Sequence, residues 1–166
     1  MNRFLPLFTA CVAIGFLSPQ VIVAEEPALP ELKPLEQFVG SWKTSMKDVE
    51  LSGDAETKWI LGGRFIQQTY SLSDSSQGMN LRGYDPKTKK YVMFTFDSNG
   101  TMLKQEGTWD QATKTLTVEG EVGDVVVVTK AHFPDQNTEE WSIIVQSKER
   151  NVLQTFQGKN VRTNRK

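Results

Sequence analysis

A long series of short strand-like segments, joined by very short connections, leaves this chain few possible folds. Apolar and polar residues alternate in these segments, or β-branched and aromatic residues cluster in them, as is typical of strands. The connections are rich in turn-forming residues, and Asn99-Gly100 is the strongest hairpin signal among them. A parallel crossover needs a dozen or more residues, so connections this short require antiparallel neighbours.

These segments predict about ten strands and an all-β fold. They are residues 42–46, 55–61, 65–72, 79–84, 91–96, 102–109, 115–121, 125–133, 139–145 and 152–156. A meander of this length is expected to close into an up-and-down antiparallel barrel, because closure removes exposed sheet edges. A short helix over residues 35–39 would close one end of this barrel. Trp42 would fill that end, and Gly40 would let the backbone turn sharply into the first strand.

The chain divides into four expected parts. Residues 1–24 resemble a secretory signal peptide, because a short positive region is followed by an apolar run and then by a small residue. Cleavage is expected near Ala24. Residues 25–34 form a Pro-rich linker, residues 35–158 the barrel, and residues 159–166 a basic tail. The apolar run is shorter than the roughly 20 residues that span a bilayer. The sequence therefore predicts a secreted or periplasmic protein without a membrane span in its mature form.

Cys11 allows an alternative, acylation as in a bacterial lipoprotein, which is disfavoured because residues 12–17 are still apolar. On the favoured interpretation the single cysteine leaves with the signal peptide, so the mature chain has no disulfide and no cysteine-bound metal. The formal net charge is −1, with both signs mixed, which gives no field to attract nucleic acid. The oligomeric state is open.

The expected barrel interior follows from strand alternation, which places Thr44 and Met46 inside if Trp42 points inward. The candidate ligand-binding residues are Trp42, Thr44, Met46, Trp59, Gln68, Tyr70, Phe94, Gln105, Trp141 and Gln154. Ten strands are wide enough for a cavity, and an apolar chamber with a few polar groups is what a small-molecule site looks like. A filled core, with satisfied glutamines, is the alternative.

Leu35 and Phe38-Val39-Gly40-Ser41-Trp42 resemble the entry motif of calycin-like barrels, which include lipocalins, fatty-acid-binding proteins and nitrobindins. Within that group the chain resembles the bacterial domain-of-unknown-function 1579 family. The matching segments are residues 59–65, 83–86, 90–91, 97, 100–101, 107 and 115–120. They span nearly all of residues 31–158. The family has no established activity, so the resemblance implies the fold and leaves the function open.

The resemblance also implies a basic side chain near the last strand that stacks on the first-strand tryptophan. Lys159 and Arg162 are the candidates, and the planar guanidinium favours Arg162 as a structural barrel-end residue with Gly40 and Trp42. The alternative is that both are solvated tail charges. A nitrobindin-like barrel would need a histidine as haem ligand. His132 is the only histidine, and its strand parity with Lys130 places it on the solvent side.

No familiar catalytic or metal-binding motif is present. Asp97 and Glu106 lie on strands joined by the Asn99-Gly100 turn and could divide acid and base roles, but surface charges are the favoured interpretation. Asp135, Asn137, Glu139 and Glu140 are expected to form a hairpin tip.

Three functions remain. An exported binding module for a small apolar or amphipathic ligand is favoured, with no cofactor or metal predicted. The alternatives are a structural or interaction domain of the cell envelope with a filled barrel, and an enzyme with a site in the barrel mouth, where Tyr70 and Glu106 would be the first candidates.

Overall fold

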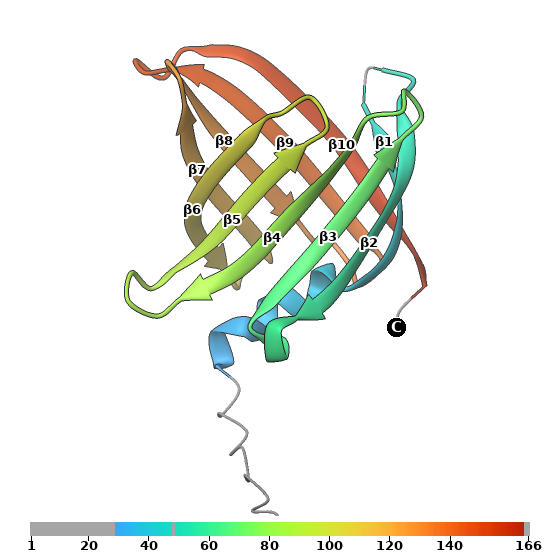
Figure 1. The fold of residues 1–166 in the computed structure, drawn as a ribbon. Helices are drawn as coiled ribbons and strands as arrows, with labels where there is room; N and C mark the ends of the chain where they lie inside the picture. The colour runs from blue at the N-terminus through green and yellow to red at the C-terminus, as the bar shows by residue number, and fades with distance from the viewer. Residues whose placement is uncertain (1–28, 48, 165–166) are drawn as a thin grey trace, which may run out of the picture.

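The computed structural model describes residues 29–47 and 49–164, which form one closed barrel of ten antiparallel strands (Figure 1). The strands are β1 (Gly40–Met46), β2 (Ser52–Ile60), β3 (Phe65–Leu72), β4 (Gln77–Asp85), β5 (Lys90–Asp97), β6 (Met102–Asp110), β7 (Thr115–Val122), β8 (Val125–His132), β9 (Thr138–Ser147) and β10 (Val152–Asn164). Each strand pairs with the next along the chain, and β10 returns to pair with β1. The predicted all-β, ten-stranded barrel is confirmed.

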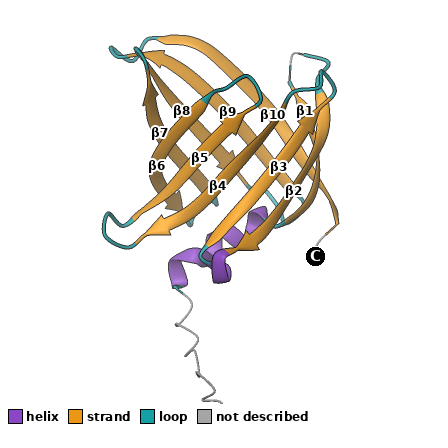
Figure 2. Cartoon of the chain, in the orientation of Figure 1, coloured by secondary structure: helices purple, strands orange, loops and turns teal. Residues whose placement is uncertain are grey.

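A 3-10 helix, η1 (Pro30–Phe38), precedes β1 and lies at one end of the barrel, here called the η1 end (Figure 2). Its buried residues are Leu32, Leu35 and Phe38, three positions apart, which puts them on one face of a helix with three residues per turn. The prediction of a linker up to residue 34 is wrong from Pro30 onward, because η1 begins there and Leu32 is already buried against the barrel. Residues 1–28, with the signal peptide and Cys11, lie outside the described residues.

β10 extends much further than the predicted 152–156, so the basic tail predicted from residue 159 is also wrong. Lys159 pairs with Glu140 of β9 on one side and with Ser45 of β1 on the other. Like every strand of the closed barrel, β10 pairs its backbone groups with those of two neighbours. Only residues 165–166 beyond it lie outside the described part.

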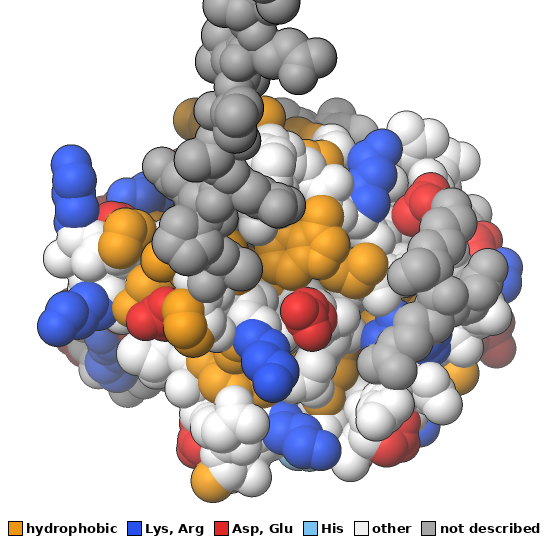
Figure 3. Space-filling view, turned by 90° about the horizontal axis from the view of Figure 1, so that it is seen from below, with side chains coloured by type: hydrophobic (Ala, Val, Ile, Leu, Met, Phe, Trp, Pro, Cys, Tyr) orange, Lys and Arg blue, Asp and Glu red, His pale blue; other side chains and the backbone are white. Residues whose placement is uncertain are grey.

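An aromatic core fills the η1 end. Phe38 and Phe133 meet edge to face with ring centroids 4.8 Å apart, and Trp42, 1% exposed, lies beside them. The indole Nε1 of Trp42 donates a hydrogen bond to the carbonyl oxygen of Phe38 at 2.8 Å. Gly40 has φ of 130°, as expected for the sharp entry into β1. In Figure 3, which views this end, apolar side chains gather near the middle and basic side chains lie around them.

Candidate functional site

The barrel encloses a cavity of about 370 Å³. A water molecule occupies about 30 Å³ in the liquid, so this volume exceeds a few waters and the filled-barrel alternative is wrong. Met46, Leu72 and Asp97 end β1, β3 and β5, the strands that run away from the η1 end, and all three line the cavity. The cavity therefore reaches the opposite end of the barrel, here called the far rim.

Most of the cavity wall is apolar. The apolar lining residues are Met46, Ala55, Leu72, Met93, Leu103, Leu116, Val118, Val127, Ala131, Ile143 and Phe156. Six of the ten predicted ligand-binding residues also line it, namely Thr44, Met46, Gln68, Tyr70, Gln105 and Trp141. The structure thus brings the central part of the expected site together.

Phe94 lies on the outer face of β5, so its predicted inward position is wrong. The residues of β5 that line the cavity are Met93, Thr95 and Asp97, so Phe94 lies on the alternate face. The reason for the error is that β5 is apolar on both faces, with Phe94 half-buried outside and Tyr91 and Met93 buried inside.

The other three predicted lining residues lie outside the cavity wall. Trp42 belongs to the aromatic core at the η1 end, and Trp59 packs against the same core. Gln154 is exposed and follows a register shift between Val152 and Gln154 in the pairing with β9. Gln154 has the same strand parity as Phe156, which lines the cavity, but it lies near the start of β10 at the far rim, beyond the cavity wall.

A hydrogen-bonded chain of polar side chains crosses one wall of the cavity, from β5 to β3. Thr95 Oγ1 donates to Asn80 Oδ1 at 2.7 Å, and Asn80 Nδ2 donates to Gln68 Oε1 at 3.0 Å. The guanidinium of Arg82 donates to the same Gln68 oxygen through Nη2 at 3.1 Å. These hydrogen bonds fix the orientation of each polar group, so this part of the wall is polar and already ordered without a ligand.

Arg82 and Glu139 are ionisable residues whose burial the sequence did not predict. Arg82 is 6% exposed and Glu139 3% exposed, and both line the cavity. The predicted position of Glu139 in a hairpin tip is wrong, because β9 begins at Thr138 and Glu139, its second residue, lines the cavity. Glu139 Oε2 accepts a hydrogen bond from Asn160 Nδ2 at 2.8 Å. Asp135 remains in the turn, where its Oδ1 accepts from the Asn137 N–H at 2.7 Å.

Burial is the main influence on the protonation of this pair. Burial lowers the pKa of Arg82, and the charge of Glu139 opposes that shift. Burial raises the pKa of Glu139, and the charge of Arg82 and the hydrogen bond from Asn160 oppose it. The inner part of the cavity thus favours the uncharged form of its carboxyl group.

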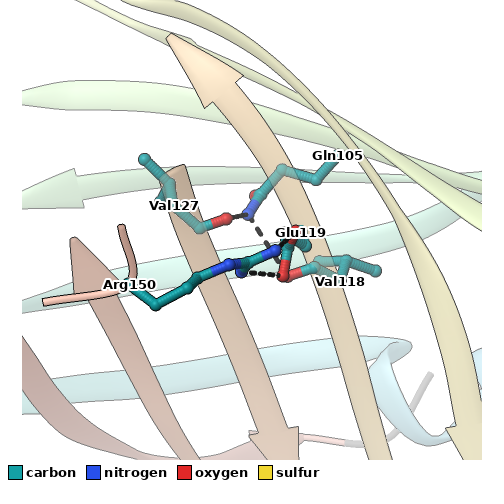
Figure 4. Close-up of polar contacts among 5 residues, drawn as sticks. All are labelled: Gln105, Val118, Glu119, Val127 and Arg150. Carbon is teal, nitrogen blue, oxygen red and sulfur yellow. Dashed lines mark hydrogen bonds and ion pairs between the residues drawn. The ribbon is translucent and has the colours of Figure 1, made fainter. Parts of the chain in front are cut away.

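Gln105, on β6 beside this wall, is 1% exposed, and both polar atoms of its side chain form hydrogen bonds (Figure 4). Its Nε2 donates to the Val127 carbonyl oxygen at 2.9 Å, and its Oε1 accepts from Thr129 Oγ1 at 3.2 Å. Figure 4 also shows Arg150 and Glu119, which form a two-bonded ion pair at 2.6 and 2.7 Å on the exposed surface. Gln105 is therefore a structural polar group that also presents its side chain to the cavity.

Arg162 stacks on Trp42, as the family resemblance implied, with Cζ 3.9 Å from the ring centroid. Its guanidinium also donates to the carbonyl oxygens of Gln37 at 2.7 Å and Gln136 at 3.0 Å, and to that of Val39. Lys159, the other candidate, is exposed. Arg162 therefore joins η1, β10 and the β8–β9 connection at the η1 end.

Glu106 lies apart from Tyr70 and Asp97, the other residues considered for catalysis. Glu106 forms an ion pair with Lys104 at 2.7 Å and does not line the cavity, and it pairs in register with Val92, several residues from Asp97. Tyr70 lines the cavity, where burial and the charge of Asp97 raise its pKa, so that it remains a neutral hydroxyl. Glu106 is therefore a surface charge, which is the interpretation favoured from the sequence.

His132 is half-buried, and its Nδ1 lies 2.8 Å from the Thr113 carbonyl oxygen rather than on the cavity wall. Within residues 29–47 and 49–164, no three histidine, cysteine or acidic side chains are grouped so that they could hold a metal ion. In the same residues no helix has the length and apolar character needed to cross a membrane.

Comparisons with known proteins place this chain among barrels of similar fold. A family model described as "Protein of unknown function (DUF1579)" matches residues 28–159. A galactocerebrosidase of Salmo salar is 28% identical over 103 residues, which are 59% of this chain and 15% of that protein, so the chain spans only a small part of it. An S-type phycobiliprotein lyase from Guillardia theta has a structure similar to this one, with a TM-score of 0.56 and 13% identity. The alignment covers 89% of this chain and 100% of the lyase.

Proposed function

The chain belongs to the DUF1579 family of proteins of unknown function, and we propose that it binds a small, largely apolar molecule inside its barrel. The observation that carries this proposal is the cavity, whose volume of about 370 Å³ falls in the range of small-molecule sites. Such sites combine an apolar wall with a few fixed polar groups, and Gln68, Tyr70 and Gln105 supply such groups here.

The polar groups support this proposal because they are held in place before any ligand arrives. Gln68 and Gln105 each make more than one hydrogen bond to groups on other strands. A site that needs no reordering loses little conformational entropy when it binds. We further propose that η1 closes one end of the barrel, so that ligands enter from the far rim. Buried Leu35 and Phe38 support that role.

We also propose that the protein is exported, with the binding barrel released after cleavage near Ala24. The sequence order of residues 1–24 supports this step. Amino-terminal sequencing of the protein purified from its own host would test it. A mature chain that begins close to Glu25 is the expected result, and a chain that still begins at Met1 would contradict it.

Extraction of the purified protein with organic solvent, followed by mass spectrometry, tests the binding function. One reproducible small molecule, present in near-stoichiometric amount, is the expected result. A matched pair of variants provides the control. Leu103→Trp fills part of the cavity, whereas Lys104→Trp adds the same bulk at the next, exposed residue. The compound should be lost from Leu103→Trp and kept by Lys104→Trp, and equal amounts in both would contradict binding inside the barrel.

A further inference from the structure

We infer that the bound molecule carries an anionic oxygen group, and that Arg82 binds this group deep inside the barrel. This inference rests on the proposed function, because it identifies the chemical class of ligand that the same cavity takes. The apolar wall then holds the remainder of an amphipathic molecule.

Arg82 has the position and the unused capacity that such a role requires. Its side chain lines the cavity, and its Cζ lies 4.7 Å from the centroid of the Phe38 ring at the η1 end. Nη2 donates to Gln68, whereas Nη1 is buried without a hydrogen-bond partner among the described protein groups. A guanidinium binds oxyanions through two parallel N–H groups, so an unused buried nitrogen at the cavity wall is a ready contact for one.

The protein itself compensates the charge of Arg82 only in part. Glu139 acts on Arg82 through space, but no direct ion pair joins these two residues in the described chain. A buried charge without a close partner is costly, and a bound anion would lower that cost.

The charge distribution along the cavity sets the orientation of the ligand. Arg82 lies next to Phe38 at the inner end, whereas Asp97 lines the cavity where β5 reaches the far rim. An anionic group is attracted to the first position and repelled from the second. The acid group is therefore expected to enter first, with the apolar part of the molecule pointing toward the far rim.

A matched pair of fluorescent probes separates charge recognition from apolar binding. The probes 1-anilinonaphthalene-8-sulfonate and N-phenyl-1-naphthylamine share their aromatic rings and differ in the sulfonate. Arg82→Met should weaken binding of the sulfonate probe by about 10-fold or more, since hydrogen bonds to charged groups contribute that much, and should change the neutral probe little. Glu139→Gln removes the opposing carboxylate and should strengthen binding of the sulfonate probe several-fold. Arg150→Met, which removes an exposed arginine, is the control and should alter neither.

Each outcome decides between the two proposals. If the wild-type protein binds neither probe, the binding function itself fails. If it binds both, and Arg82→Met weakens them equally or not at all, the binding function stands and the role of Arg82 is overturned. If Arg82→Met does not fold, Glu139→Gln decides, because unchanged affinity for the sulfonate probe would overturn the inference.

Displacement of the neutral probe identifies the acid group. Dodecanoate, dodecyl phosphate and dodecan-1-ol carry the same apolar chain with different head groups. Stronger displacement by one of the acids than by the alcohol is expected, and the stronger acid shows whether a carboxylate or a phosphate fits. Equal displacement by all three would contradict recognition of an anion.

Discussion

Glu139 is a carboxyl group enclosed by the barrel, and its environment has a direct consequence for stability. Its side chain accepts a hydrogen bond from Asn160, while burial disfavours its charged form. The folded state is therefore more stable when the carboxyl group of Glu139 is protonated. At neutral pH the fold carries a cost that a neutral side chain of the same shape would not have.

We predict that Glu139→Gln makes thermal stability less dependent on pH. The folded-state pKa lies above the ordinary value of 4.5. The contribution of Glu139 to stability is therefore fully present below that value and is lost as the pH rises through the folded-state pKa. Melting temperatures of both proteins between pH 4 and pH 8 would measure this. The melting temperature of the variant should rise relative to that of the wild type as the pH increases. If the two melting temperatures change with pH in parallel, Glu139 does not have this effect.

Arg162 is predicted to stabilise the η1 end through its stacking on Trp42 and its hydrogen bonds to three carbonyl oxygens. Arg162→Ala should lower the free energy of unfolding by about 2 kcal/mol, because a stacking contact and charged hydrogen bonds are both lost. Urea denaturation measures the change. Lys159→Ala, at an exposed position of the same strand, should fall within about 0.5 kcal/mol of the wild type. Similar losses in both variants would contradict the special role of Arg162.

At the level of the strands, β6 and β7 approach each other closely at Gly107. A Cβ atom added there would lie 1.8 Å from the backbone carbonyl oxygen of Thr117, which is far inside contact distance. Gly107 belongs to the residues that carry the family resemblance. The pairing of β6 with β7 thus depends on the absence of a side chain at this position.

Gly107→Ala should therefore destabilise the barrel by about 1–3 kcal/mol or more, because two backbone segments would have to separate. The matched control is Thr108→Ala at the next, exposed residue, which should have little effect. Melting temperatures and amide exchange of β6 and β7 would measure the change. Equal stability of the two variants would show that the strands adjust without cost.

The strands also show how far the sequence could predict this fold. The alternating segments predicted the number of strands, and the short connections predicted their antiparallel order. Both predictions are correct even where the structure of a turn differs from the one that the sequence suggests. The Asn99-Gly100 signal predicted a hairpin between the right strands, but Phe96 pairs with Met102 across a longer connection, and of the two residues only Gly100 has a positive φ, of 90°. The Asn99 side chain accepts the Thr101 N–H at 2.8 Å and stabilises the longer turn.

The inward faces were harder to predict than the strands. Alternation identified Thr44, Gln68 and Gln105 correctly, because polar and apolar positions differ clearly there. It failed at Phe94, where both faces are apolar. Arg82 and Glu139 gave no signal, since charged residues are nearly always exposed and only a partner on another strand shows otherwise. These partners come together only when the barrel closes, and a local sequence pattern does not show which distant strands will meet.

The whole molecule is a barrel that closes through the pairing of β1 with β10, two strands more than a hundred residues apart in sequence. Removal of residues 159–166 would delete the β10 residues that pair with β1 from Trp42 to Ser45, together with Arg162. We predict that this truncation prevents formation of a stable barrel, whereas removal of residues 165–166 alone leaves it folded. Circular dichroism and gel filtration would measure the difference. A compact, cooperatively melting protein lacking residues 159–166 would contradict the assignment of these residues to the closing strand.

The pairing of β1 with β10 has a consequence for synthesis as well. A ribosome makes β10 after the other nine strands, so a growing chain cannot complete its sheet, and β1 and β9 remain unpaired edges that could join those of another chain. A nascent chain is therefore most exposed to aggregation just before its last strand emerges, and a chaperone that shields β1 until then would protect it most.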